Sequence, residues 1–195
     1  MKLLNILTIT FFILLIISCN KEKQIEKSIT DSNKEKFKKS EYFDEDRIKD
    51  DKYNVKTNGS DASYGELELY YKHNNSKKED MLPYSLMMVE KHKKFKYASD
   101  VFEHFLDLYT DAELNYNGTN NSLILYLNNI KKLNSDQKNY LLYYLKLGVK
   151  NRSMSSIRYM EILNRQGIGV TKNIQKADSL NIILNELKKE NHMNN

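Results

Sequence analysis

Three stretches of different hydrophobic and polar patterning follow one another along the chain. Residues 3–17 are almost wholly apolar and are interrupted by only a few polar side chains. Residues 20–57 are rich in charged side chains, and apolar residues are sparse among them. From residue 58 onward, apolar residues recur at spacings of three and four, which is the period of an amphipathic α-helix. The pattern predicts a short apolar leader, a charged segment and an all-α domain over residues 58–195.

The helical part divides at residues that typically begin or end helices. We expect Ser60-Asp61 and Ser135-Asp136 to cap helices, and Pro83 to lie in the first turn of another. Residues 110–120 predict a loop, and Gly167-Ile168-Gly169 predicts the end of the penultimate helix. The positions that we expect to face a core are Tyr64, Leu67 and Tyr71; Leu82, Leu86 and Val89; Tyr97, Val101, Phe105 and Tyr109; Leu123, Leu127 and Ile130; Leu141, Tyr144 and Leu145; Met154, Ile157 and Met160; and Ala177, Leu180, Leu184 and Leu187.

Helices of about 12–18 residues joined by short turns are typical of α/α repeats. A single proline and six glycines argue against a turn-rich β-sandwich or barrel. We therefore predict an all-α helical-repeat stack of about three helix pairs. The adjacent tyrosines Tyr70-Tyr71 and Tyr143-Tyr144 are not expected all to face one core, so some should be exposed. Whether the tyrosines serve helix packing or a protein interface stays open.

The last helix pair resembles a Sel-type tetratricopeptide-like repeat over residues 153–188. The matching features are the turn Gly167-Ile168-Gly169-Val170, the polar residues after it, and the pair Lys176-Ala177 that opens the second helix. The chain departs from the repeat where Asp178-Ser179-Leu180 replaces the usual aromatic residue. Upstream, residues 61–92 and 95–149 keep the spacing of helix pairs without the glycine turn and the Lys-Ala pair. The resemblance implies a stack whose concave surface binds partner proteins.

The first residues have the pattern of a secretory signal. Met1-Lys2 supplies a positive start, the apolar run follows, and Ser18 precedes Cys19. The apolar run is shorter than the roughly 20 residues that a membrane span needs. We predict a signal peptide over residues 1–18. A single-span anchor in which Cys19 is incidental is the alternative.

The residues Ile16-Ile17-Ser18-Cys19 resemble the lipobox of bacterial lipoproteins. The resemblance implies that Cys19 is lipidated, that the signal is cut before it, and that fatty chains such as palmitate hold the chain on a lipid bilayer. Two or more acyl chains give a stable anchor. Asn20 follows where inner-membrane lipoproteins often carry Asp, so the resemblance favours the outer membrane of the cell envelope. Its periplasmic and surface faces both stay open.

Residues 19–57 are interpreted as the lipidated N-terminus followed by a disordered charged tether. Basic and acidic residues nearly balance there, and the segment has too few apolar residues to offset the entropy of ordering. The alternative is a solvated helix around residues 33–51, supported by Glu–Lys pairs.

Charge and candidate chemistry add little to this picture. The formal net charge of +5 is mild and spread along the chain, which argues against nucleic-acid binding. The single cysteine excludes an internal disulfide. No histidine stands at a zinc-binding spacing from another histidine or a cysteine. We expect His104 to lie at the rim of the core. The four histidines are His73, His92, His104 and His192.

Two short motifs are rejected as sites. The run from Glu113 to Gly118 faintly mimics a calcium loop, but its twelfth position is Ile124 rather than Glu. Gly167 and Gly169 follow a helix rather than a strand, without the lysine of a phosphate loop. The sequence therefore predicts no catalytic, cofactor-binding or metal-binding residue, no cofactor, and a protein that is not an enzyme.

The function predicted from the sequence is a membrane-anchored lipoprotein whose helical-repeat domain mediates protein–protein interaction in the cell envelope. Scaffold or adaptor roles fit it, as does immunity against a toxin, and the protein partner is unknown. The alternative is an envelope enzyme or small-ligand binder. Its acid and base residues would converge in a pocket that sequence spacing does not reveal.

Overall fold

A computed structural model describes residues 44–73 and 80–193, and these residues form helices and loops without a strand. The all-α prediction is confirmed. The α-helices are α2 (Glu45–Asn58), α3 (Asp61–His73), α4 (Leu82–Leu86), α5 (Ala98–Thr110), α6 (Asn120–Leu127), α7 (Ser135–Lys150), α8 (Met154–Gln166) and α9 (Ile174–Met193). A π-helical turn, η2 (Met87–Lys91), and two 3₁₀ helices, η3 (Phe95–Tyr97) and η4 (Asn128–Lys132), complete the set.

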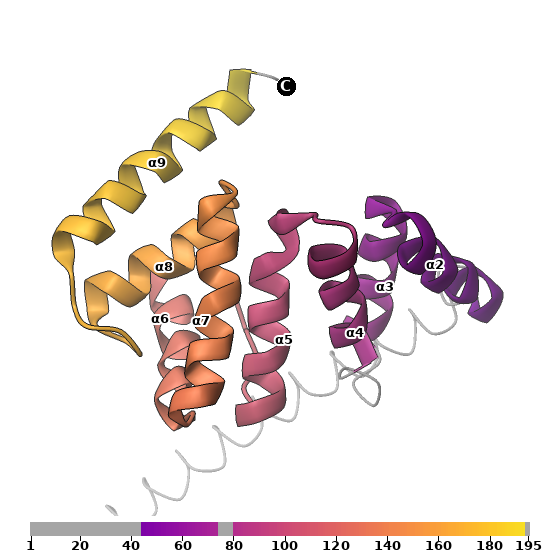
Figure 1. Cartoon of the computed structure of the whole chain (residues 1–195), viewed down its shortest axis with the longest axis horizontal. Helices are drawn as coiled ribbons and strands as arrows, with labels where there is room; N and C mark the ends of the chain where they lie inside the picture. Colours follow the sequence, from indigo (N-terminus) through magenta and orange to yellow (C-terminus); the bar gives the residue numbers. More distant parts are fainter. Residues whose placement is uncertain (1–43, 74–79, 194–195) are drawn as a thin grey trace, which may run out of the picture.

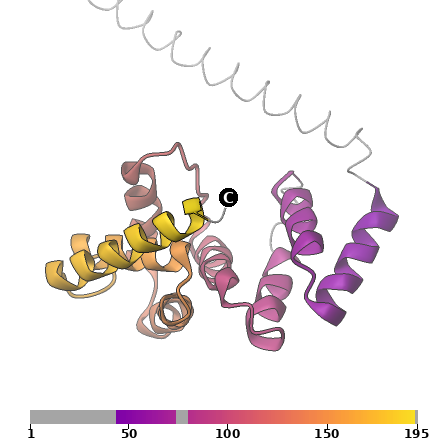
Figure 2. The same cartoon turned by 90° about the horizontal axis from the view of Figure 1, so that it is seen from above.

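The helices pack mainly against their neighbours along the chain, as in a helical-repeat stack. α2 packs on α3, α4 on α5, α7 on α8 and α8 on α9 (Figure 1). α5 also packs directly on α7, although α6 lies between them in the sequence. Seen from above, the helices form an open arc (Figure 2). α3 lies in one arm of the arc, and α6 with the end of α9 lies in the other. No helix among the described residues has the length and apolarity needed to cross a membrane.

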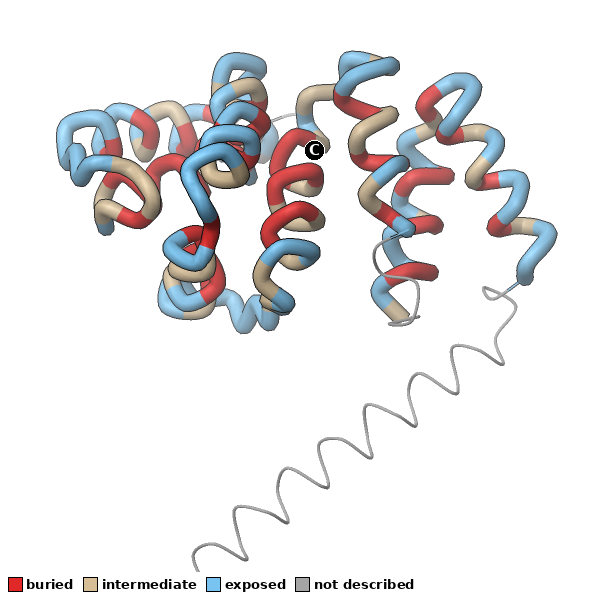
Figure 3. The backbone as a smooth tube through the Cα atoms, turned by 60° about the horizontal axis from the view of Figure 1, so that its bottom comes forward, coloured by how far each residue is buried: buried red, intermediate tan, exposed pale blue. Residues whose placement is uncertain are grey.

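The core consists of two clusters of buried side chains that lie between the helices (Figure 3). The larger cluster joins α5 to α9 and contains Phe102, Leu106, Leu127 and Leu163. The smaller cluster joins α2, α3, α4 and η2. Its members are Ile48, Val55, Tyr64, Leu67, Tyr70, Tyr71, Met81, Tyr84 and Met88. Tyr97 packs against both clusters and connects them.

The predicted tether extends too far along the chain. Helix α2 begins at Glu45, within the stretch that we interpreted as disordered over 19–57. Asp44 caps its N-terminus by accepting a hydrogen bond from the Asp46 amide, and Gly59 ends it in the left-handed conformation. The apolar residues of α2 are few, but Ile48 and Val55 lie seven residues apart on one face and are buried against α3. The folded domain therefore includes α2, which the predicted boundary at residue 58 left out.

Two further predictions about helix starts meet different outcomes. Pro83 lies in the first turn of α4, as expected. The cap of α7 is not Ser135-Asp136 but Asn134, whose side chain accepts from the Gln137 amide at 2.9 Å. The Gln137 side chain in turn accepts a hydrogen bond from the Asn134 amide at 3.1 Å, so the two residues form a capping box.

The predicted core positions are buried with a few exceptions. Helix α4 buries Tyr84 and Ser85, and η2 buries Met88 and Val89, whereas Leu82 and Leu86 are half-buried. The π turn adds a residue to the helical turn and so shifts the buried face. Tyr70 and Tyr71 are both buried, in one cluster with side chains of α2 and α4, whereas Tyr143 is exposed. The expectation that some of the adjacent tyrosines are exposed is therefore confirmed. Tyr97 and Met154 are half-buried, and Tyr109 is exposed.

The C-terminal hairpin follows the prediction closely. Gly167 takes the left-handed conformation at the end of α8, and its amide donates to the Leu163 carbonyl. Ala177 is fully buried in α9, as expected for a close helix contact. An equally close contact that the sequence did not reveal lies at Gly148 of α7. A Cβ atom there would lie 2.1 Å from Ser156 Oγ of α8.

Candidate functional site: a groove of opposite charges

Helix α5 carries three carboxylates on one side and the core on the other. Asp100, Glu103 and Asp107 are spaced three and four residues apart, which places them on one face of the helix. The opposite face buries the apolar residues Val101, Phe102, Phe105 and Leu106. The amphipathic pattern that buries α5 therefore also aligns its carboxylates on the side away from these apolar residues.

Each of these carboxylates accepts a hydrogen bond from a tyrosine of a different helix. Tyr64 of α3 donates to Asp100 at 3.1 Å, and Tyr159 of α8 donates to Glu103 at 2.6 Å. Tyr126 of α6 donates to Asp107 at 2.7 Å and also lies 3.2 Å from the Glu103 carbonyl. The three tyrosines are buried, so they fix the position of α5 relative to three other helices.

Removal from water raises the pKa of two of these carboxyl groups. The pKa of Asp100 rises to about 7, because burial and the nearby negative charge of Glu68 disfavour its ionised form. The pKa of Glu103 rises to about 8, because burial and its acidic neighbours outweigh the hydrogen bond from Tyr159. Burial beside Asp107 likewise raises the pKa of Tyr126 well above its usual value. The face of α5 therefore contains groups that exchange protons near neutral pH.

A cavity of about 420 Å³ lies between α3 and this face of α5. Four acidic side chains and one lysine line it, together with aromatic and apolar residues. Glu68, Glu103 and Glu113 form no ion pair within the described residues. The cavity is lined by Glu68, Tyr71, Lys72, Met81, Glu103, His104, Asp107, Glu113, Leu114 and Tyr116.

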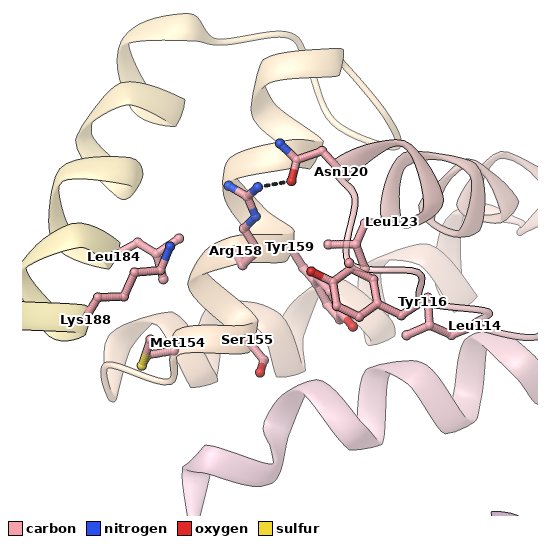
Figure 4. Close-up of a pocket in the computed structure, with 11 residues that line it drawn as sticks. Leu114, Tyr116, Asn120, Leu123, Met154, Ser155, Arg158, Tyr159, Leu184 and Lys188 are labelled. Carbon is pink, nitrogen blue, oxygen red and sulfur yellow. Dashed lines mark hydrogen bonds between the residues drawn. The ribbon is translucent and has the colours of Figure 1, made fainter. Parts of the chain in front are cut away.

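A second cavity, of about 540 Å³, adjoins the first on the side of α8 and α9. Its lining contains two cations, Arg158 and Lys188, and no acidic residue. Figure 4 shows Lys188 reaching from α9 toward Arg158, with the rings of Tyr116 and Tyr159 on the other side of Arg158. The cavity is lined by Leu114, Tyr116, Gly118, Asn120, Leu123, Met154, Ser155, Arg158, Tyr159, Leu184 and Lys188.

The Arg158 guanidinium is held in place by two neighbours. Its Nη1 donates to Glu161, a buried residue one turn further along α8, at 3.1 Å. Its Nη2 donates to the side chain of Asn120 at the start of α6 (Figure 4). Of the five N–H donors of an arginine, these contacts use two and leave three. Arg158 is therefore oriented and still able to bind an anion.

The pair Ser85 and His104 lacks the geometry of a catalytic dyad. Ser85 Oγ lies 3.0 Å from His104 Nδ1, within reach of a general base. The single hydroxyl proton of Ser85 is donated to the Leu82 carbonyl at 2.9 Å, so Nδ1 is the donor to Ser85. Ser85 is also fully buried and out of reach of a substrate. His104 is half-buried, at the rim of the core, as its sequence predicted.

Comparisons with known proteins place the chain in no family. No protein-family model, curated protein or solved structure matches it.

Several residues that the sequence analysis weighed line the groove, among them Tyr71, His104 and Glu113, but none of them was predicted as a site. Cys19 and the signal peptide lie outside the described residues. In the described part of the chain, no group of three or more His, Cys, Asp or Glu side chains has the arrangement of a metal site. Glu113 and Asn115 of the rejected calcium motif are exposed. The carboxylates of α5 were missed, although their spacing of three and four was visible, because a charged helix face usually just faces solvent.

Proposed function

We propose that this chain is a lipid-anchored protein of the bacterial cell envelope that binds a partner protein along the inside of its helical arc. The lipobox-like residues before Cys19 support the anchor. The observation that carries the binding role is the groove, in which tyrosines and charged side chains from four helices and one loop converge. Such a concave surface is the usual binding surface of helical-repeat proteins. The role is that of a scaffold or adaptor, and toxin immunity is one form of it.

The anchor is tested by metabolic labelling. Cells expressing the full chain are grown with alkyne-tagged palmitate, and the protein is isolated and probed for the tag. We expect label on the wild-type chain and none on Cys19→Ala. Equal labelling of the two chains, or a mature protein that still begins at Met1, would contradict lipidation at Cys19.

The binding role is tested by photocrosslinking in the same cells. A benzophenone amino acid replaces Tyr116, which is 58% exposed and lines both cavities. The matched control carries it at Tyr53, which is 66% exposed on α2 and lines neither. We expect a discrete crosslinked protein from position 116 only. The same products from both positions, or none from position 116, would contradict binding in the groove.

An envelope hydrolase is a second candidate, and one observation favours it. Glu103 and Asp107 line the same cavity one helical turn apart, and Glu103, with a pKa of about 8, holds a proton at neutral pH. Enzymes that cleave glycosidic bonds use a pair of carboxyl groups, one of which donates a proton. The purified mature chain would be incubated with isolated envelope glycan and assayed for new reducing ends. Activity lost in Glu103→Gln would support an enzyme, whereas an inactive wild-type chain would remove this candidate.

A further inference from the structure

The two cavities form one continuous groove. Leu114 and Tyr116, from the loop between α5 and α6, line both of them. Tyr159 lines the second cavity, and its hydroxyl donates to Glu103, which lines the first. A bound chain that passes from one cavity to the other would therefore contact Leu114, Tyr116 and Tyr159. Aromatic and aliphatic side chains at the centre of an interface are the usual anchors of binding.

The ends of the groove carry opposite charges. Even with Glu103 protonated at neutral pH, Glu68, Asp107 and Glu113 outnumber Lys72 in the first cavity. The lining of the second cavity has Arg158 and Lys188 without an acidic residue. Lys188 makes no ion pair within the described residues. A nucleic acid or an anionic lipid surface would meet repulsion from the acidic end, whereas a ligand with both charges matches the whole length.

We propose that the groove holds an extended segment of the partner protein, with a Lys or Arg side chain in the cavity between α3 and α5 and a carboxylate at Arg158 and Lys188. The carboxylate comes from an acidic side chain or from the C-terminus of the partner. The intervening residues of the segment lie over Leu114 and Tyr116. The order of charges fixes the direction in which the segment binds. This inference rests on the proposed binding function and adds the chemistry of the partner to it.

The probe is an array of short synthetic peptides of varied sequence, each made with a free and with an amidated C-terminus. It is incubated with the full mature chain carrying Cys19→Ala, which has no cysteine to accept lipid. We expect the retained peptides to share a basic residue on one side of an apolar stretch and a carboxylate on the other. Retention of the free form alone would assign the carboxylate to the C-terminus, and retention of both forms would assign it to an acidic side chain.

Charge variants decide whether the charged side chains of the groove bind the retained peptides. Lys188→Gln should weaken binding of a retained peptide about tenfold, the effect expected for one ion pair at an interface. Lys189→Gln, the next residue on α9, lines neither cavity and should leave binding unchanged. At the acidic end, Glu113→Gln should weaken selection for the basic residue, and Asp111→Asn in the same loop should not. Both groove side chains are exposed, so these variants keep the fold.

Three results would overturn the inference. These are an array that retains no peptide, retained peptides without the charge pattern, and equal effects of Lys188→Gln and Lys189→Gln. Each leaves the crosslinking test of the proposed function intact, because a partner that binds through a folded surface would still crosslink at position 116. Absence of that crosslink would defeat the proposed function itself.

Discussion

Glu103 links the stability of the domain to pH through its raised pKa. A carboxyl group whose pKa is higher in the folded than in the unfolded chain stabilises the fold in its protonated form. That contribution is complete below the unfolded pKa of 4.5 and is lost as pH rises through about 8. Asp100 acts in the same direction up to about pH 7. The charged or titratable neighbours of the two groups are Glu68, Tyr64, Lys96, Asp107 and Tyr159.

We expect the free energy of unfolding to fall as pH rises from about 5 to 8, in the window set by these groups. Glu103→Gln removes one titrating group, so the fall should be shallower in this variant. Urea denaturation at several pH values measures it. Glu186→Gln, at an exposed position on α9, should keep the wild-type slope. A slope unchanged by Glu103→Gln would show that this carboxyl is ionised in the fold.

The same proton affects binding of a cationic side chain in the acidic cavity. A cation favours ionised Glu103, so binding releases its proton below about pH 8. We expect the affinity for a retained peptide to increase as pH rises from 6 to 8.5 in the wild-type chain and to change less in Glu103→Gln. Fluorescence anisotropy measures both, and equal pH profiles would contradict a cation beside Glu103.

Gly148 is a residue at which helix α7 packs closely on helix α8. An added Cβ would lie 2.1 Å from Ser156 Oγ and 3.1 Å from the Cβ of Ala98. We expect Gly148→Ala to destabilise the domain by about 1–3 kcal/mol, the usual cost of overpacking. Gly65→Ala is the matched control, because a Cβ at this position meets nothing within 4 Å. It should be neutral or stabilise by up to about 1 kcal/mol, since alanine favours helix. Thermal unfolding compares the two, and equal losses would contradict this packing.

Helix α2 illustrates what the sequence can and cannot predict at the scale of an element. Helix α9 has an apolar residue on every turn, and the four residues that we expected it to bury are all buried. In α2, Ile48 and Val55 stand among charged residues, and composition alone indicates disorder. Helix α2 is ordered because it packs on the apolar surface of α3. This is a tertiary contact, and the local sequence pattern does not reveal it.

The position of α2 predicts where the folded domain begins. A chain that starts at residue 58 lacks Ile48 and Val55, whose burial contributes about 1.5–3 kcal/mol each. It should unfold at a clearly lower temperature than a chain that starts at residue 44. Val55→Ala should lower stability in the longer chain, and Tyr53→Ala on the exposed side of α2 should not. Equal melting temperatures of the two chains would contradict a structural role for α2.

At the scale of the whole molecule, the sequence predicts the architecture but not the groove. Hydrophobic periodicity and the glycine turn indicated a helical stack, and the described residues form one. The groove depends on which helices meet. Tyr64, Tyr126 and Tyr159 are far apart in the chain, and only packing brings them to the carboxylates of α5. Arg158 and Lys188 likewise share a cavity because α8 and α9 form a hairpin.

The central claim is that a partner protein lies in the charged groove of the anchored chain. The most direct measurement is the yield of the crosslink from position 116 in living cells that carry either Lys188→Gln or Lys189→Gln. Because only Lys188 lines the groove, we predict that the crosslinked protein declines strongly with Lys188→Gln and persists with Lys189→Gln. A yield that is the same in both variants would contradict the claim.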